Sequence, residues 1–294
     1  MKDIMTIVIR LTLACMLAAT VMGIAFLVTN KAKKHNQHVN EQKVRYSLLG
    51  YSEQKPIPES MTLHEIYRYI VTSADGQSIG YLLPGKEGFI FVTIDLEGKM
   101  LENKPVQVDE AMVREKEERD KVIRKVVGGG KDIAFADQTI VVTENGKRVA
   151  YLLDGKFTGF KTFIGVMLAL DPQFSILGLE ILEHEEDPGL GAEIKQKYFK
   201  NQFKGKSFST LKKLEVVKEP MPDGYVQALE DTVGGSDAAG ILKQYVDHDI
   251  YALTGATISS RSVNNGVKGI VKKFAYRLNI LDSVLVEQKI AVAF

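Results

Sequence analysis

The stretch that most constrains this chain lies near its start, from Leu11 to Thr29, and contains no charged residue. Nineteen helical residues at about 1.5 Å each extend about 28 Å, which matches the hydrocarbon core of a bilayer. Arg10 precedes the run, and its long side chain can reach the headgroups. A cleaved signal peptide fits the same pattern, although the run is long for one and no clear small-x-small site ends it. We therefore expect a retained transmembrane anchor over residues 1–30.

The composition limits the cofactors and partners that need to be considered. The formal net charge is +1, so charge gives no case for nucleic acid as a partner. Cys15 is the only cysteine and lies within the apolar run. A single thiol cannot form an intramolecular disulfide or hold a zinc ion or an iron–sulfur cluster with partner thiols. Redox chemistry in this chain would therefore require a bound organic cofactor.

Residues 31–130 are expected to hold a polar juxtamembrane helix or linker and a first strand-rich block. Strand patterns from about Thr72 are interrupted by turns at Asp75-Gly76 and Glu97-Gly98. Residues 109–125 are densely charged with few apolar positions, which predicts a solvated connecting helix.

A second strand–turn block opens the next segment and resembles the first at an offset of 70 residues. Tyr81-Leu82-Leu83 and its following Gly-Lys pair recur as Tyr151-Leu152-Leu153 with Gly-Lys. The match indicates a partial internal duplication, although the alternation of strands and turns alone can produce part of the match. Neither of the two motifs described below occurs in the first block, so we expect one cofactor per chain.

The remaining pattern predicts an α+β fold. After the second block we expect a strand–turn–strand over 163–182, a short helix over 195–203 and a strand over 214–217. Apolar residues from Val263 to Leu278 recur at helical spacing, which predicts an amphipathic helix. We therefore expect an N-terminal transmembrane helix followed by a twisted, mainly antiparallel sheet with helices packed on one side. Residues 131–280 would form the second domain, and 281–294 a C-terminal tail.

A hydroxyl-rich segment, Thr254-Gly-Ala-Thr-Ile-Ser-Ser260, stands directly before the predicted amphipathic helix. Free backbone N–H groups and the positive end of the dipole favour an anion at such a helix start. Gly255 and Ala256 would let a phosphate approach the backbone, and Thr257 would place a hydroxyl beside it. On the residues alone, an ordinary capped helix start explains the same segment.

The second motif is an acidic loop, Glu183-His-Glu-Glu-Asp-Pro-Gly-Leu-Gly191, that ends in a Pro-Gly turn. Its carboxylates and His184 could suggest a metal site. Adjacent acidic residues on a loop are more often solvated, so we expect no metal here.

Together the two motifs resemble those of the FMN-binding domain family. That family includes the G subunits of the Rnf complexes and the C subunits of the sodium-pumping NADH:quinone oxidoreductases. The run Leu-Thr-Gly-Ala-Thr-Ile-Ser-Ser looks like the family's flavinylation motif. The resemblance implies a phosphoester between FMN and Thr257, which a flavin transferase installs from FAD. One position departs from the pattern, because Tyr251 stands where the family has Asp; Asp249, two residues earlier, is the candidate substitute.

The acidic loop is similar to a second family element, His-x-Glu-Thr-Pro-Gly-Leu-Gly, with Asp187 in place of Thr. Its glycines would let backbone amides approach an edge of the flavin ring. The run Gln-Phe-Lys-Gly-Lys-Ser at 202–207 is also typical of the family, and the resemblance covers about residues 137–275. It assigns FMN binding to Thr254, Gly255, Ala256, Thr257, Ser259, Ser260, Glu186, Pro188, Gly189, Leu190 and Gly191.

The resemblance implies an electron-relay subunit of a membrane-bound, Rnf-type ion-translocating ferredoxin:NAD oxidoreductase. Expected partners are other integral membrane subunits and, during maturation, the flavin transferase. A membrane-tethered FMN-binding module or stand-alone reductase outside any pump is the alternative, and an unflavinylated structural protein is a third reading. Family domains lie on the outer side of the cytoplasmic membrane. The lysines that directly follow the apolar run argue for the opposite orientation by the positive-inside rule.

Overall fold

A computed structural model describes residues 2–232 and 234–294 of the chain, which falls into two units. The first unit ends at Ser47 and is formed by α1 (Lys2–Leu48), a single helix whose last residue belongs to the second unit. Within it, Ile4–Leu27 is long and apolar enough to cross a membrane, with a mean hydropathy of 2.2. The juxtamembrane segment, for which we expected a helix or a linker, is helical. The second unit runs from Leu48 to Phe294 and holds all the described strands.

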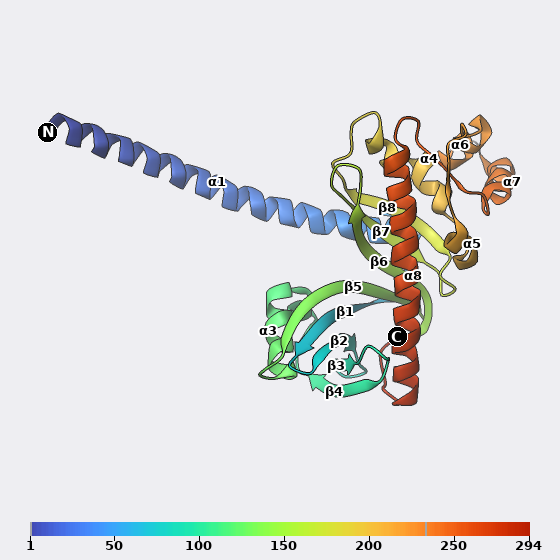
Figure 1. Cartoon of the computed structure of the whole chain (residues 1–294), viewed down its shortest axis with the longest axis horizontal. Helices are drawn as coiled ribbons and strands as arrows, with labels where there is room; N and C mark the ends of the chain where they lie inside the picture. Colours follow the sequence, from blue (N-terminus) through green and yellow to red (C-terminus); the bar gives the residue numbers. More distant parts are fainter. Residues whose placement is uncertain (1, 233) are drawn as a thin grey trace. The chain divides into compact units, whose positions relative to one another are not determined.

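The second unit is built on one eight-stranded antiparallel sheet in the order β4-β3-β2-β1-β5-β6-β7-β8 (Figure 1). The strands are β1 (Met61–Ser73), β2 (Gly76–Pro84), β3 (Phe89–Ile94), β4 (Met100–Val106), β5 (Asp132–Glu144), β6 (Lys147–Thr158), β7 (Phe163–Leu170) and β8 (Ile176–Glu183). A separate parallel pair joins β9 (Val216–Val217) to β10 (Ile250–Tyr251).

Helices fill the connections and the C-terminal part. They are α2 (Glu110–Arg114), α3 (Lys116–Val127), α4 (Lys197–Lys200), α5 (Phe208–Lys213), α6 (Asp223–Leu229), α7 (Gly235–Tyr245) and α8 (Thr257–Glu287), with 3-10 turns η1 (Gly191–Lys195) and η2 (Asn201–Phe203). The predicted short helix over 195–203 is thus divided among η1, α4 and η2. The expected α+β fold and its mainly antiparallel sheet are confirmed.

The sheet consists of two four-stranded meanders, β1–β4 and β5–β8, joined by antiparallel pairing of β1 with β5. The repeated Tyr-Leu-Leu run occupies the second strand of each meander, β2 and β6. The suggested duplication therefore has a counterpart in the topology. Pairing of β1 with β5 shifts register between Arg68 and Tyr69, where Ala136 is the extra residue opposite. Such a bulge bends a strand and redirects its side chains.

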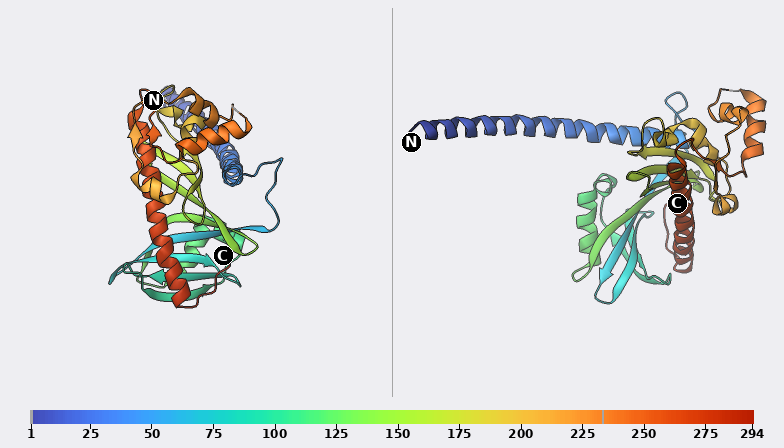
Figure 2. Two further views of the ribbon diagram at one scale, coloured as in Figure 1. Left: turned by 90° about the vertical axis from the view of Figure 1, so that its right-hand side faces the viewer. Right: turned by 45° about the horizontal axis from the view of Figure 1, so that its top comes forward.

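Helices cover both faces of the sheet, which corrects the expectation of helices on one side. The α8 helix crosses one face, where Val263, Val267 and Val271 join the largest core cluster (Figure 2). On the opposite face of the first meander, Ile123 and Val127 of α3 pack against the sheet. The prediction of a solvated helix is therefore wrong for α3, because its few apolar residues share one face and pack against the sheet.

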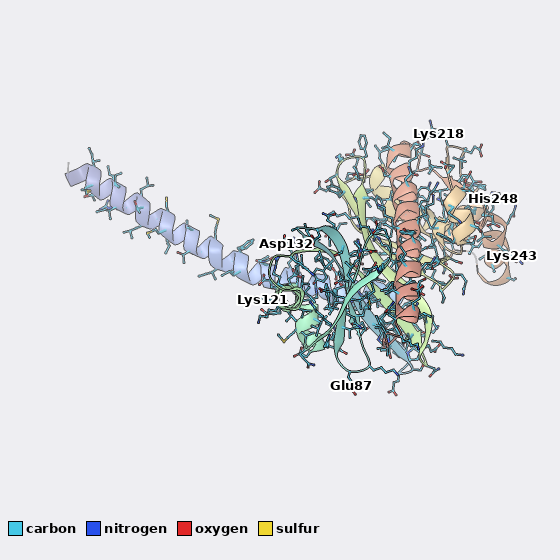
Figure 3. The ribbon with its side chains drawn as sticks, turned by 60° about the horizontal axis from the view of Figure 1, so that its bottom comes forward. Glu87, Lys121, Asp132, Lys218, Lys243 and His248 are labelled. Atoms are coloured by element: carbon cyan, nitrogen blue, oxygen red, sulfur yellow. The ribbon has the colours of Figure 1, made fainter. Side chains whose placement is uncertain are left out.

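A buried arginine accompanies those apolar residues of α3. Arg119 lies with its guanidinium 4.0 Å from the Tyr67 ring centre and donates from Nε to the Tyr69 hydroxyl at 2.8 Å. The arginine stem packs while its charged end is hydrogen-bonded, so a charged sequence position becomes part of the core. Other charged residues of this unit, such as Glu87, Lys121 and Asp132, are exposed (Figure 3).

Candidate functional site

The Thr254–Ser260 segment forms a tight turn that leads into α8. Gly255 has a φ of +76°, in the left-handed region that glycine tolerates, and the Ala256 N–H donates to the Leu253 carbonyl at 3.0 Å. Ser260 is buried; its hydroxyl lies 3.0 Å from both the Leu253 nitrogen and the Ala256 carbonyl. Thr257 is the first helical residue, and the N-cap residue makes no side-chain capping bond. The first N–H groups of α8 are thus available to an anion.

The acidic loop is organised around Glu186, which is only 5% exposed. Its Oε1 accepts hydrogen bonds from the backbone nitrogens of Phe160 at 2.8 Å and Lys161 at 3.2 Å. Its backbone nitrogen donates to Nδ1 of His184 at 3.2 Å. Burial, with a contribution from Lys195, lowers the pKa of His184, which favours the neutral ring that this acceptor role requires. Asp187 forms an ion pair with Lys161 at the surface.

One hydrogen bond joins the two motifs. The Ser259 hydroxyl in the first turn of α8 donates to Oε2 of Glu186, and both residues are buried. We refer to this contact as the Glu186–Ser259 link. It connects residues 73 positions apart in the sequence and holds the acidic loop beside the start of α8. The two motifs that the sequence analysis singled out therefore lie at one site.

Two glycines allow the motifs to approach this closely. A Cβ added to Gly191 would stand 2.7 Å from the Ser259 hydroxyl and 2.8 Å from a Glu186 oxygen. A Cβ added to Gly255 would stand 2.9 Å from Cδ2 of Leu190. Gly189 differs, because its φ of +71° requires glycine-like backbone freedom although nothing lies within 4 Å of its Cβ position. The resemblance predicted the same role for Gly189 and Gly191. In the structure, Gly191 leaves room for the Glu186–Ser259 link, whereas Gly189 supplies a positive φ.

Two cavities open at the joined motifs, and Leu190, Gly255 and Thr257 line both. The larger has a volume of about 870 Å³ and the smaller about 390 Å³. Sites for small molecules and cofactors commonly measure about 300–1,000 Å³. A phosphate-bearing ligand of cofactor size therefore fits here, with the helix start on one side and the open cavities on the other.

Comparison with known proteins identifies the segment that contains these motifs. Residues 159–272 match the model of the FMN-binding domain. This segment is similar to the FMN-binding domain family. The resemblance that the two motifs indicated is confirmed, and the match supports FMN as the cofactor.

A curated relative is similar to half of this chain. It is the G subunit of the proton-translocating ferredoxin:NAD(+) oxidoreductase complex of Clostridium ljungdahlii, 28% identical over 148 residues. The match covers 50% of this chain and 62% of that relative, so the chain spans less than two thirds of the relative's length.

Two solved structures are also similar to this chain, with low sequence identities and low TM-scores. Shewanella oneidensis NqrC is 20% identical with a TM-score of 0.35, covering 58% of this chain and 72% of that one. The C subunit of the Na(+)-translocating NADH-quinone reductase of Parabacteroides distasonis is 19% identical with a TM-score of 0.34, covering 66% and 77%.

The Gln-Phe-Lys-Gly-Lys-Ser segment of the FMN-binding domain has a structural role. The Gln202 side chain accepts from the Tyr251 nitrogen at 2.8 Å and donates to the Tyr251 carbonyl at 3.3 Å, as a neighbouring strand would. Lys206 is 1% exposed, and its ammonium donates to the carbonyls of Val246 at 3.0 Å and His248. Burial lowers the pKa of Lys206 to about 8, while Asp247 and Asp249 act in the opposite direction. These contacts anchor the chain that leads into the Thr254 turn.

The position that departs from the family pattern, Tyr251, lies on β10 among aromatic side chains. Its ring centre is 6.1 Å from that of Tyr225, which stacks on Tyr245 at 4.2 Å. Asp249, the candidate substitute, accepts a hydrogen bond from the Glu215 nitrogen at 2.8 Å through its side chain. Asp249 therefore has a structural contact, which favours a fixed position for its carboxylate.

Several residues at the site were not anticipated from the sequence. Phe160 is 56% exposed and lines the smaller cavity, and its backbone binds Glu186. Tyr198 and Lys218 line the larger one, with Lys218 at the surface (Figure 3). Phe160 had one signal in the sequence, a phenylalanine in a turn, whereas nothing in the sequence indicated Tyr198 or Lys218. Nine of the eleven residues assigned by resemblance line these cavities, whereas Pro188 and Ser260 line neither, and the roles of all eleven toward FMN stay predictions.

Proposed function

We propose that this chain is a membrane-anchored electron-transfer flavoprotein that carries FMN as a phosphoester on Thr257. The observation that carries the proposal is the position of Thr257. It begins a helix of 31 residues, lines both cavities and lies beside the acidic loop of an FMN-binding domain. A hydroxyl at this point would stand next to a phosphate seated on the first N–H groups of α8.

Attachment of FMN forms one bond at the Thr257 hydroxyl oxygen and breaks one bond in FAD. The Thr257 hydroxyl oxygen forms a bond to the FMN phosphorus of FAD, the phosphoanhydride bond breaks, and AMP leaves as the hydroxyl proton is lost. A flavin transferase would catalyse this step and supply the base that accepts the proton. Ser259 and Ser260 are engaged in internal hydrogen bonds. Thr254 and Thr257 both line the larger cavity, and of these two hydroxyl residues only Thr257 also lines the smaller one.

The larger cavity gives the cofactor a defined environment. Leu190 and Met221 provide apolar surface, whereas Glu193, Glu219 and Glu230 provide carboxylates. Bound FMN supplies the capacity to exchange one or two electrons. The carboxylates oppose added negative charge nearby and would therefore make reduction of a bound flavin less favourable.

We further propose that the protein acts as a subunit of an Rnf-type complex, with other integral membrane subunits as partners. The relative of Clostridium ljungdahlii, whose name places it in such a complex, supports this, together with the apolar helix at Ile4–Leu27. Affinity purification of the tagged full-length chain from detergent-solubilised membranes provides the test. Recovery of integral membrane subunits with the chain would support complex membership; recovery of the flavinylated chain alone would favour a stand-alone module.

Mass spectrometry of the tryptic peptide 244–261 tests the covalent bond. The protein should be produced with a flavin transferase in the compartment that holds the domain. The peptide should gain the mass of FMN less one water, and the intact protein should fluoresce on a denaturing gel. Thr257→Val should abolish both signals, whereas Ser262→Ala, which removes a hydroxyl further along the same helix, should retain them. Fluorescence that persists in a folded Thr257→Val protein would refute the assignment.

We propose that the N-terminus lies inside and the flavin domain outside the cytoplasmic membrane. The lysines after the apolar run argue against this orientation, but the charge difference is small and large domains translocate largely regardless of it. Alkaline phosphatase fused after Phe294 folds only when exported and should be active. An inactive phosphatase, together with a fluorescent cytoplasmic reporter at the same site, would reverse the orientation and make attachment by an exported transferase untenable.

A further inference from the structure

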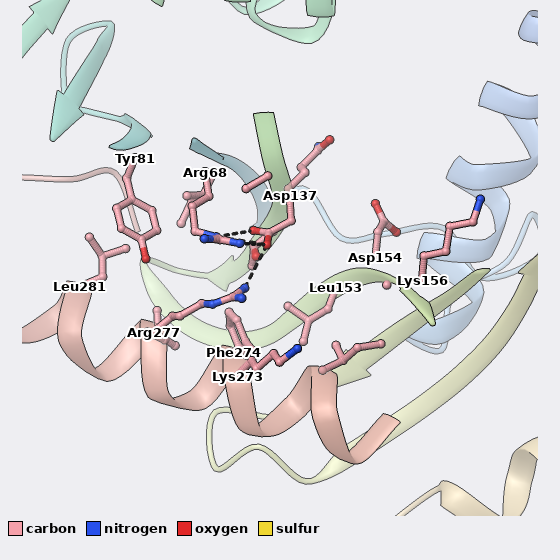
Figure 4. Close-up of a pocket in the computed structure, with 17 residues that line it drawn as sticks. Arg68, Tyr81, Asp137, Leu153, Asp154, Lys156, Lys273, Phe274, Arg277 and Leu281 are labelled. Atoms are coloured by element: carbon pink, nitrogen blue, oxygen red, sulfur yellow. Dashed lines mark hydrogen bonds and ion pairs between the residues drawn. The ribbon is translucent and has the colours of Figure 1, made fainter. Parts of the chain in front are cut away.

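A third cavity, of about 310 Å³, lies between α8 and the strands at the centre of the sheet (Figure 4). It is lined from β1, β2, β5, β6 and α8, where the two meanders meet. Arg277 on its wall is about 30 Å along α8 from Thr257, at about 1.5 Å per residue. The cavity is therefore separate from the proposed flavin site, and neither motif contributes to it.

Two arginines in this cavity share one carboxylate. Arg68 donates from Nε to the two oxygens of Asp137 at 3.0 and 3.1 Å, and also from Nη2. Arg277 donates to Asp137 Oδ2 from Nη1 at 3.0 Å. The Arg68 side chain is only 12% exposed, and those of Asp137 and Arg277 are 32% and 35% exposed. One carboxylate neutralises one guanidinium, so this partly desolvated cluster retains one positive charge.

The unneutralised charge comes with unused donors. A guanidinium has five N–H groups, and the contacts to Asp137 occupy only some of those on Arg68 and Arg277. The rim of the cavity adds Lys156, Lys273 and Asp154, so the surroundings do not cancel the positive excess. A guanidinium fork matches the two oxygens of a carboxylate.

Tyr81 adds a third donor from β2. It is 7% exposed, lines the cavity and points its hydroxyl toward the space beside Arg277 (Figure 4). Among the residues that the structure describes, no side chain or backbone group forms a hydrogen bond with this hydroxyl. Burial raises the pKa of Tyr81 to about 12, so the hydroxyl keeps its proton and acts as a donor. A hydroxyl that opens onto a cavity and has no protein partner is available to a ligand.

The backbone at this point is also irregular. The register shift in the β1–β5 pair falls at Arg68, the residue that holds Asp137. Bulges are common beside functional sites, where they redirect a side chain. Gln138 and Thr139 also line the cavity, and much of the remaining wall is apolar, with Ile66, Phe274 and Leu281 facing the same space. The cavity therefore combines an oxyanion-binding corner with an apolar body.

We propose that this cavity binds a small organic monocarboxylate with a flat apolar body. The carboxylate lies against Arg68, Arg277 and the Tyr81 hydroxyl, and it neutralises the one excess charge of the cluster. The apolar body lies along Phe274 and Leu281. An ion pair with a purely structural purpose needs one arginine for one aspartate; the second arginine and the unpartnered hydroxyl are what a ligand would use.

Isothermal titration calorimetry of the full-length chain in detergent tests the proposal, with 2-naphthoate and the uncharged 2-naphthamide as probes. The acid should bind at one site per chain and at least about tenfold more tightly than the amide, because only the acid forms charge-assisted bonds. Equal affinities for acid and amide, or no binding of the acid in the millimolar range, would overturn the proposal.

Variants then locate the binding. Arg277→Met should weaken naphthoate binding by at least about tenfold, since it removes the excess charge. Lys272→Met removes a charge from an exposed position of the same helix and should leave the affinity unchanged. Tyr81→Phe removes one donor while it preserves the ring, and should weaken binding severalfold even if Arg277→Met does not fold. Unchanged affinity in folded Tyr81→Phe would refute the role of the hydroxyl and with it the proposed site.

Discussion

Replacement of Glu186 offers the sharpest test of how the two motifs are held together. Its carboxylate accepts hydrogen bonds from two backbone nitrogens and from the Ser259 hydroxyl, and the residue is 5% exposed. Glu186→Ala removes all three bonds and leaves the donors to find water in a site that is largely closed. Hydrogen bonds to charged groups contribute about 1.5–3 kcal/mol each. Because Phe160 and Lys161 are exposed enough for water to replace part of their loss, we expect a decrease in unfolding free energy of about 3–5 kcal/mol.

Glu186→Gln provides a matched control of nearly the same shape. Its carbonyl can still accept from the two backbone nitrogens, and its amide can donate to the Ser259 oxygen. The expected loss is therefore about 1 kcal/mol, the difference between charged and neutral hydrogen bonds. Urea denaturation followed by circular dichroism, in a Thr257→Val background that removes any covalent flavin, gives both values without a contribution from the cofactor.

A double-mutant cycle with Ser259→Ala isolates the Glu186–Ser259 link itself. Residues in one hydrogen-bond network commonly show coupling energies of about 0.5–3 kcal/mol, and we expect about 1–2 kcal/mol here. The reasoning fails if Glu186→Ala costs less than about 1 kcal/mol or if the coupling is near zero. In the flavinylated protein, the same loss should change the flavin spectrum, because the loop that lines both cavities would no longer be fixed.

Three further predictions concern other features. Gly191→Ala places a Cβ against the Glu186–Ser259 link and should destabilise the fold by about 2 kcal/mol and alter the flavin spectrum. Gly189→Ala should destabilise it by about 1 kcal/mol from its positive φ alone, and the reverse order of the two stability losses would contradict the assigned roles. The pKa of Lys206 is lowered to about 8 in the folded state, so the unfolded state binds more protons between about pH 8 and 10.5. The unfolding free energy should therefore rise with pH across that window, and a Lys206→Met protein should lack this rise; identical pH profiles would refute it. The flavin-to-chain ratio, from flavin absorbance and amino-acid analysis of the denatured protein, should be near one, and a ratio near two would place a second flavin in the first meander.

Local patterns in the sequence predicted local structure well. The apolar spacing from Val263 to Leu278 predicted α8, because a helix that packs on a sheet must repeat its buried positions at helical spacing. The turns at Asp75-Gly76 and Glu97-Gly98 likewise separate strands, as expected. The site motifs were recognised from resemblance, and the structure brings them together.

The contacts that join distant segments could not be predicted. No local rule pairs Glu186 with Ser259, since one lies on a loop and the other 73 residues later on a helix. The burial of Arg119 was missed for a related reason: a charged pattern does not reveal that two tyrosines will provide a ring and a hydroxyl for the guanidinium. The Arg68–Asp137–Arg277 cluster draws on β1, β5 and α8, so it exists only once the sheet order is set.

The eight-stranded sheet also determines how far this protein can be shortened. The segment that matches the FMN-binding domain begins at residue 159, after β6, and so contains only β7 and β8 of the sheet. A fragment cut there would leave β7 as an open edge, and seven of its eight residues are buried in the intact protein. An exposed, apolar edge strand pairs readily with another copy of itself. Such a fragment should aggregate, and the upstream strands protect the flavin-binding part from self-association.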